Sequence, residues 1–304
     1  MPKTYLALDL GGTFIKYGLL TEDGDILSQG KIASPTETEQ DTLNGLAQIR
    51  DLVEGDYDGV AVSMPGRIDT AKGIAHTGGA YSWVRDWAAE ERISEVFGKP
   101  ATVANDGKCA AQAELWKGAL SDVNSGVVLV LGTAVGGGVV LDHKVWMGTS
   151  GGAGELSNLT VSYESAIEKG IGFPQNGFVL WALHVGAAGM TDKFARRKGR
   201  EHSNGIELFE AYDRGDEDAR ATLEEFGRWM AVGILNVQAV LDVERFAIGG
   251  GISARPEVAE YAAAGVEKLF AENPMPFSTP EVVTCTFGNE ANLIGALGFH
   301  LNRG

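Results

Sequence analysis

The sequence predicts an α/β protein made of two similar halves with a cleft between them. Short apolar runs with the length of strands alternate with longer segments in which apolar residues recur at helical spacing. Each half opens with apolar runs on both sides of a glycine-rich loop, which is the pattern of a β-hairpin. The chain has 304 residues, of which 44% are hydrophobic, so it is long enough for roughly two domains.

The first half is expected to begin with three antiparallel strands. The apolar run 5–9 ends at a Gly-Gly pair, the run 14–20 follows it, and residues 26–32 can pair back after an acidic turn. Leu43, Leu46, Ile49, Leu52 and Val53 then lie at helical spacing. The remaining expected elements are a strand over 60–63, a helix over 87–97, a strand over 101–104 and an alanine-rich helix from Asn105 to about Trp116.

The second half repeats this rhythm. An apolar strand over 127–131 runs into a glycine-rich stretch, and the runs 139–141 and 144–147 flank a further turn. The expected boundaries are an N-terminal domain over 1–117, a C-terminal domain over 118–290 and a final helix over 291–304 that packs back on the N-terminal domain. Within the second domain we expect helices over most of 164–241, a strand over 246–248 and a strand over 282–287, and a last helix over 289–301.

The net charge and the cysteine content indicate which binding partners and which cellular compartment are expected for the protein. The formal net charge of −16 argues against sequence-independent binding of nucleic acid, which needs clustered Lys and Arg. The two cysteines, Cys109 and Cys285, form no CxxC pair and cannot build a disulfide framework, which fits a reducing, cytoplasmic compartment. No signal peptide is expected at the start of the sequence, and no apolar run approaches the ~18 residues of a membrane span.

The first glycine loop is the segment Asp9-Leu10-Gly11-Gly12-Thr13. Two adjacent glycines can turn tightly and present backbone N–H groups to phosphate oxygens. Asp9 would face the same space and could hold Mg²⁺ through water, and Lys16 could add positive charge. The alternative is a Gly-Gly hairpin with an exposed aspartate, and the pentapeptide alone leaves both interpretations open.

Two further glycine clusters strengthen the hypothesis of a nucleotide site. Residues 132–138 lie between two apolar strands, and the Thr133 hydroxyl could donate a hydrogen bond to a phosphate oxygen. Gly249, Gly250 and Gly251 follow a strand and could let an adenine ring or a ribose lie flat on the backbone. Each loop alone could be a close-packed hairpin or a plain strand–helix connection, but two such loops at corresponding places in both halves favour phosphate binding.

Two carboxylates are the candidates for catalysis and for sugar binding. Asp106 stands where a strand gives way to a helix, and a carboxylate there can accept the proton of an attacking hydroxyl. Asn-Asp-Gly is also a turn and N-cap signal, so a capping role is the alternative. Glu155 follows the flexible stretch 151–154 and could accept hydrogen bonds from two sugar hydroxyls, or it could be a surface residue. The five histidines show no metal-binding grouping.

Taken together, these motifs resemble those of the ROK family of sugar kinases, within the actin-like ATPase superfamily, over essentially the whole chain. Residues 9–13 resemble its DxGGT phosphate motif, and residues 131–139 resemble its second phosphate loop. The other matches are Ser63-Met64-Pro65-Gly66 to the G-x-P-G stretch of the sugar domain, Asn105-Asp106 to the sugar-binding Asn and catalytic Asp, Gly154-Glu155 to the start of the GEIGH segment, Gly249-Gly250-Gly251 to the adenosine motif, and residues 291–296 to the final helix.

The resemblance implies a two-domain, ribonuclease H-like fold whose domains close over the substrates. It also implies in-line transfer of the γ-phosphoryl group of Mg-ATP to a hexose hydroxyl, usually the one on C6. Asp106 would be the base, and Gly66, Asn105 and Glu155 would bind the sugar. The nucleotide would contact Asp9, Gly11, Gly12, Thr13, Lys16, Gly132, Thr133, Ala134, Gly136, Gly250 and Gly251.

Three positions depart from the family pattern. The GEIGH histidine, a zinc ligand that touches the sugar, is replaced in Leu156-Ser157-Asn158, and the cysteine cluster that follows it is absent, so no zinc is expected. A second sugar-contacting glutamate is either Glu164 or Glu168, of which we select Glu168. Ala134 replaces a glycine of the second phosphate loop, and alanine would be strained there if the position requires a positive φ.

The sequence therefore favours a cytoplasmic ATP-dependent hexose kinase, active on glucose or a glucose-like sugar, with ATP and Mg²⁺ and no zinc. A β-glucoside, N-acetylhexosamine or N-acetylmannosamine substrate is the alternative within this class. A sugar-responsive regulator is disfavoured, because eight residues before Asp9 leave no room for a DNA-binding module. An inactive protein with the same fold is disfavoured only by Asp106. A homodimer is expected by analogy.

Overall fold

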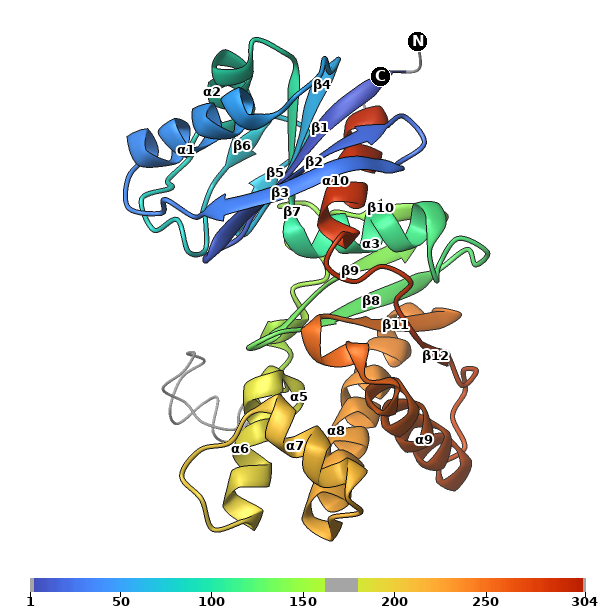
Figure 1. Ribbon diagram of the computed structural model, residues 1–304. Helices are drawn as coiled ribbons and strands as arrows, with labels where there is room; N and C mark the ends of the chain where they lie inside the picture. Colours follow the sequence, from blue (N-terminus) through green and yellow to red (C-terminus); the bar gives the residue numbers. More distant parts are fainter. Residues whose placement is uncertain (1–2, 162–179, 303–304) are drawn as a thin grey trace.

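The computed structural model describes residues 3–161 and 180–302, so Glu164 and Glu168 lie outside the described residues. Within this part of the chain, two five-stranded sheets lie one above the other (Figure 1). The first sheet has the order β3-β2-β1-β4-β7. Its antiparallel strands are β1 (Thr4–Leu10), β2 (Phe14–Thr21) and β3 (Ile26–Ala33), and β4 (Gly59–Met64) and β7 (Ala101–Asn105) continue it in parallel to β1.

The second sheet repeats this topology and confirms the duplication expected from the sequence. Its order is β10-β9-β8-β11-β12, again with an antiparallel meander followed by two parallel strands. The strands are β8 (Gly126–Leu131), β9 (Val135–Leu141), β10 (Lys144–Trp146), β11 (Arg245–Gly249) and β12 (Glu281–Thr284).

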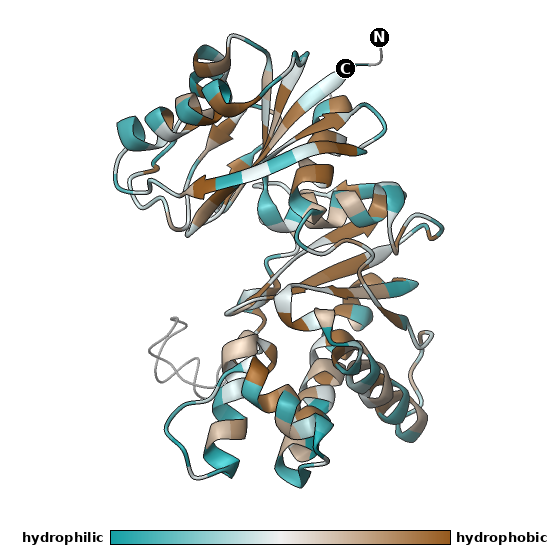
Figure 2. Ribbon diagram, in the orientation of Figure 1, coloured by the Kyte–Doolittle hydropathy of each residue, from teal (hydrophilic) through white to brown (hydrophobic). Residues whose placement is uncertain are grey.

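The outer faces of the sheets are covered by different sets of helices. Apolar residues of α1 (Glu39–Leu52) and α2 (Ala89–Phe97) form one core with Leu6, Leu8 and Leu10 of β1. The second sheet is covered by α5 (Ala182–Val185), α6 (Ala187–Arg197), α7 (Gly205–Asp213), α8 (Glu217–Leu241) and α9 (Pro256–Glu272). Figure 2 shows hydrophobic strands in both sheets and hydrophilic outer sides on these helices.

Two helices lie between the sheets and share a third core. They are α3 (Asp106–Lys117) and α10 (Ala291–Leu301), which pack against each other. Because successive strand residues point to opposite faces, Ala7 and Ala61 face this core while their neighbours face the outer one. A Cβ at Gly295 would overlap the Cys109 carbonyl oxygen, so the close approach of the two helices requires glycine there. The proposed domain limits at 117 and 290 thus fall at the ends of these shared helices.

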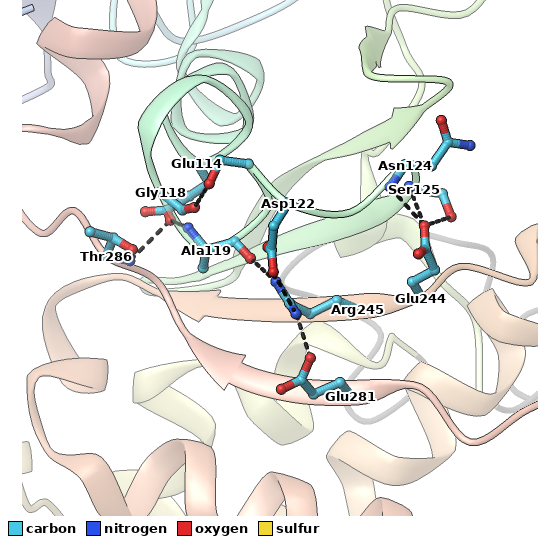
Figure 3. A network of polar contacts seen from close by, with 11 residues as sticks. Glu114, Gly118, Ala119, Asp122, Asn124, Ser125, Glu244, Arg245, Glu281 and Thr286 are labelled. Carbon is cyan, nitrogen blue, oxygen red and sulfur yellow. Dashed lines mark hydrogen bonds and ion pairs between the residues drawn. The ribbon is translucent and has the colours of Figure 1, made fainter.

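A network of polar contacts ties the end of α3 to the chain that enters α10 (Figure 3). Glu114 is completely buried, and its carboxylate accepts hydrogen bonds from the backbone N–H groups of Ala119 at 2.7 Å, Thr286 at 3.0 Å and Phe287 at 2.9 Å. Arg245, at the start of β11, donates to the Ala119 carbonyl oxygen. Three donors to one carboxylate offset its burial and hold the two segments together.

Several boundaries differ from the sequence expectation, for reasons visible in the backbone. The helix expected from Trp87 begins at Ala89, because Trp87 pairs with Ala75 as an antiparallel bridge. The strand expected from 139 begins at Val135, so part of the glycine-rich stretch is strand. The last strand ends at Thr284. The Cys285 N–H still bonds the Ile248 carbonyl oxygen, but the N–H groups of Thr286 and Phe287 bind Glu114 instead of a neighbouring strand. The short pair β5 (Ile68–Asp69) and β6 (Ile74–Ala75) and the 3-10 turns η1 (Leu156–Asn158) and η3 (Gly251–Ala254) were not anticipated.

Among the described residues, no helix is both long enough and apolar enough to cross a bilayer.

Candidate active site

The first glycine loop is the tight turn between β1 and β2. The Gly11 N–H bonds the Phe14 carbonyl oxygen at 3.1 Å, and a Cβ on Gly11 would lie 2.9 Å from that oxygen. The Gly11 carbonyl oxygen accepts hydrogen bonds from the hydroxyl groups of Tyr81 and Ser34. Gly12 and Thr13 stay exposed at the tip of the turn. Hydrogen bonds from Tyr81 and Ser34 therefore fix the base of the turn, while its tip remains accessible to a ligand.

Asp9 lies at the end of β1 and is 7% exposed. Its Oδ1 accepts hydrogen bonds from Ser63 Oγ at 3.1 Å and from Asn292 Nδ2 at 2.9 Å. The Lys16 ammonium lies 3.7 Å from Oδ2. One carboxylate in this polar setting fits a Mg²⁺ ion bound through water, since Mg²⁺ keeps several of its waters in phosphate-transfer sites. Among the described residues no group of three or more His, Cys, Asp or Glu side chains could hold a metal directly.

The second glycine loop connects β8 to β9 and is shorter than the sequence suggests. Gly132 N–H bonds the Ala134 carbonyl oxygen at 3.0 Å, and Ala187 N–H, at the start of α6, bonds the Gly132 carbonyl oxygen at 2.8 Å. Gly132 and Thr133 are exposed, and Gly136 lies exposed within β9. Ala134 is not among the described non-glycine residues with positive φ, so its side chain causes no backbone strain.

The third glycine cluster follows β11 and touches the second loop. Gly250 has a φ of 97°, and a Cβ on it would overlap the Leu131 carbonyl oxygen. Beyond Gly251, a cavity of about 510 Å³ opens between η3 and the start of α7. Its walls include Ile206, Phe209 and Ile252, with Asn204, Asp213 and Arg255 at the polar positions. Apolar walls with a few polar groups suit a purine ring.

Asp106 and Asn105 lie at the junction of β7 and α3. Asn105 caps the helix, because its Oδ1 accepts a hydrogen bond from Lys108 N at 3.2 Å. Its Nδ2 donates at 2.9 Å both to the Gly66 carbonyl oxygen and to Asp106 Oδ1. Gly66 has a φ of 102°, and a Cβ there would overlap the Thr77 carbonyl oxygen. The structure thus brings together Gly66, Asn105 and Asp106, and the capping and functional interpretations are compatible.

Burial raises the pKa of the Asp106 carboxyl to about 6. The hydrogen bond from the Gly107 N–H acts in the opposite direction, as does the positive charge of Lys108, whereas the nearby charges of Asp9 and Glu155 raise the pKa further. A carboxylate with a pKa near neutrality is better matched to general base catalysis than an ordinary aspartate.

Glu155 lies directly before η1, and its side chain is 50% exposed. Its Oε1 accepts a hydrogen bond from the Lys108 ammonium at 2.8 Å, and the Lys108 side chain is completely buried. Sequence inspection did not single out Lys108, although it follows Asp106 by two residues. The signal available in the sequence was a single lysine near the start of an alanine-rich segment. The burial of eight consecutive residues, 107–114, is visible only in the folded chain.

The ends of β1, β8 and β11 and the start of α3 lie on the same side of the molecule in Figure 1. Two exposed glycine-containing turns, a buried aspartate and a helix-start aspartate of raised pKa thus gather around the junction of two sheets with the same topology. Such a duplicated fold with a glycine turn in each half defines the class of actin-like ATPases.

The chain belongs to the ROK family, whose family model matches residues 5–302. It is 26% identical to a β-glucoside kinase of Klebsiella pneumoniae, over 98% of this chain and 95% of that protein, and 26% identical to a glucokinase of Halalkalibacterium halodurans, over 96% and 93%. A solved structure of a ROK family protein from Streptococcus pneumoniae TIGR4, in complex with sucrose, superposes with a TM-score of 0.85 at 27% identity, covering 99% of this chain and 98% of that one.

Proposed function

We propose that this chain, an ATP-dependent sugar kinase, phosphorylates the C6 hydroxyl of glucose or a glucose-like hexose with Asp106 as the base. The observation that carries the proposal is the half-buried carboxyl of Asp106, held at the start of α3 by Asn105 and Gly107. Asn105 also bonds the carbonyl of Gly66, so the three candidates Gly66, Asn105 and Asp106 form one hydrogen-bonded unit.

The nucleotide is proposed to run along the three glycine loops. The purine would enter the cavity bounded by Phe209 and Ile252, and the ribose would cross Gly250 and Gly251. The phosphates would then reach the exposed turns formed by Gly12 and Thr13 and by Gly132 and Thr133, since backbone N–H groups in such turns can form an anion-binding nest. Ala134 and Gly136 would line the same loop, and Lys16 would contribute positive charge beside Asp9.

Asp9 would hold Mg²⁺ through water, with Ser63 and Asn292 fixing its carboxylate. When bound, Mg²⁺ neutralises charge on the β- and γ-phosphates of the nucleotide. The Asp9 carboxylate, 3.7 Å from the Lys16 ammonium, would accept hydrogen bonds from the waters of the metal. No zinc is proposed, because the chain lacks the cysteine cluster and the GEIGH histidine.

In the transfer step the sugar hydroxyl oxygen forms a bond to the γ-phosphorus while the bond from that phosphorus to the ADP oxygen breaks. The hydroxyl proton passes to the Asp106 carboxylate. Glu155 accepts hydrogen bonds from other sugar hydroxyls and fixes the ring, so that one hydroxyl faces the phosphorus. Transfer of the proton to a positioned carboxylate is worth roughly 10²–10⁴-fold in rate.

A β-glucoside is the second candidate substrate, and one cavity favours it. The cavity measures about 400 Å³ and lies between residues 67–72 and residues 147–151. Its first wall begins directly after Gly66, and its second wall ends four residues before Glu155. Polar groups such as Asp69 and Ser150 line it, so a second sugar ring or a polar aglycone could occupy it. The names of relatives also include β-glucoside kinases.

The test is to incubate the protein with Mg-ATP and a panel of hexoses, hexosamines and β-glucosides, and to identify products by ³¹P NMR. A 6-phosphate of glucose or a glucoside supports the proposal, whereas transfer to another position or to no sugar contradicts it. S150W fills the second cavity and should raise KM for a glucoside but not for glucose. Equal effects on both acceptors would exclude the glucoside subsite.

A cytoplasmic location and a homodimer remain part of the proposal, supported by the free thiols of Cys109 and Cys285 and by analogy with the family.

A further inference from the structure

Lys108 is a buried cation at the start of the proposed catalytic helix. Its side chain has no exposed surface, although lysine is among the residues least often buried completely. Its ammonium lies 2.8 Å from Glu155 Oε1, and in the part of the chain that the structure describes this is its one ion pair. Because removing an ammonium from water is costly, such a residue needs a compensating role in the fold or in the reaction.

The partner of Lys108 is unusual as well, because it is half-exposed and comes from a distant segment. Glu155 lies 47 residues further along the chain, after β10, while Lys108 lies in the first turn of α3. The buried ammonium of Lys108 therefore forms an ion pair with a carboxylate that is half-exposed to solvent. A glutamate on a loop has several rotamers, and a buried cation selects those that keep the ion pair.

The charges around Asp106 make the same lysine important for the base. Asp9 from β1 and Glu155 from the segment after β10 are the negative groups that act on Asp106, and Lys108 from α3 is the positive one. In the absence of Lys108, its positive charge would no longer offset the negative charges of Asp9 and Glu155 near Asp106. Because like charges disfavour ionisation, the Asp106 carboxyl would then ionise less readily.

We propose that Lys108 is a positioning residue, which fixes the Glu155 carboxylate for the sugar hydroxyls and keeps Asp106 ionised as the base. This inference rests on the proposed roles of Asp106 and Glu155. Lys108 is too deeply buried to touch the sugar, so it acts through the two carboxylates.

The test compares K108M with K117M, a matched change of the exposed lysine at the other end of the same helix. In K108M, KM for the sugar should rise about tenfold, the loss expected for one charged hydrogen bond, while KM for ATP stays within about twofold. The acid limb of kcat/KM against pH should move to higher pH by roughly one pH unit. K117M should change neither quantity.

E155Q provides a second variant that does not depend on K108M folding. It removes a negative charge near Asp106 and leaves Lys108 in place, so the acid limb should move to lower pH while KM for the sugar rises. The double variant K108M/E155Q should bind sugar no worse than E155Q alone, because the lysine acts through the glutamate.

A purely structural lysine would lower the melting temperature of K108M and leave both the pH limb and the sugar KM unchanged, which would overturn the inference. The inference would also be overturned if the acid limb of kcat/KM moved in the same direction in K108M and in E155Q. Full activity of D106N would instead show that the proposed base is wrong, and the role of Lys108 toward that base would fall with it.

Discussion

The proposed base Asp106 lies in an environment that is unfavourable for a negative charge. Its carboxyl accepts hydrogen bonds from Asn105 and Gly107 and lies near two other carboxylates. The folded pKa of about 6 exceeds the ordinary value of 3.8, so the ionised form is destabilised by folding. The penalty develops as the pH rises above 3.8 and is complete above about 6, where the proposed base would be ionised.

We predict that D106N is more stable than the wild type although it loses activity. Asparagine keeps an Oδ1 acceptor for the two hydrogen bonds but carries no charge. The free energy of unfolding at pH 8 should increase by on the order of 2 kcal/mol, and the gain should shrink toward pH 4. Denaturant unfolding measures it, and D23N on the exposed β2–β3 turn should leave stability unchanged. A D106N protein less stable than the wild type at pH 8 would refute the prediction.

Gly66 is a second residue whose identity follows from its backbone. We predict that G66A loses sugar affinity and at least about 2 kcal/mol of stability, because the new methyl group overlaps the Thr77 carbonyl oxygen at a positive φ. G98A is the control, since Gly98 also has a positive φ but its Cβ would meet nothing within 4 Å. Similar losses in both variants would mean that strain alone, and not the contact, determines the effect.

At the scale of elements, the glycine loops are fixed by contacts between segments that lie far apart in the sequence. Gly250 packs against Leu131, so the loop after β11 supports the turn after β8. We predict that G250A raises KM for ATP by at least about tenfold, leaves KM for the sugar unchanged and lowers the melting temperature. In G251A the melting temperature should stay unchanged, because a Cβ there meets nothing within 4 Å. A change in ATP affinity of G251A would then report direct contact with the nucleotide.

The elements that could be predicted from the sequence are those with strong local patterns. The apolar runs of β1, β4 and β8 are buried on both faces, so their composition alone identifies them. The start of β9 was missed because its glycines pair in a ladder, which no local composition signals. Lys108 was missed because its burial depends on Glu155, which approaches only in the folded chain. Ser63 and Asn292 converge on Asp9 for the same reason.

At the scale of the whole molecule, α3 and α10 connect the two sheets through one core that is rich in alanine. The proposed substrates would bind at the edge of this shared core, and ligand binding should therefore stabilise the entire chain. We predict that glucose alone raises the melting temperature with the logarithm of its concentration, and that N105A abolishes the shift. Sorbitol at equal concentration is the control for nonspecific stabilisation. A shift that persists in N105A would place the sugar elsewhere.

The most direct test of phosphoryl transfer by Asp106 is sugar-stimulated ADP release from Mg-ATP, measured for the wild type and D106N under identical conditions. The expected result is turnover by the wild type that requires a hexose or a glucoside, and a decrease of at least about 10²-fold in D106N with KM for ATP preserved. ADP release that ignores every sugar, or a D106N protein as active as the wild type, would contradict the proposed mechanism.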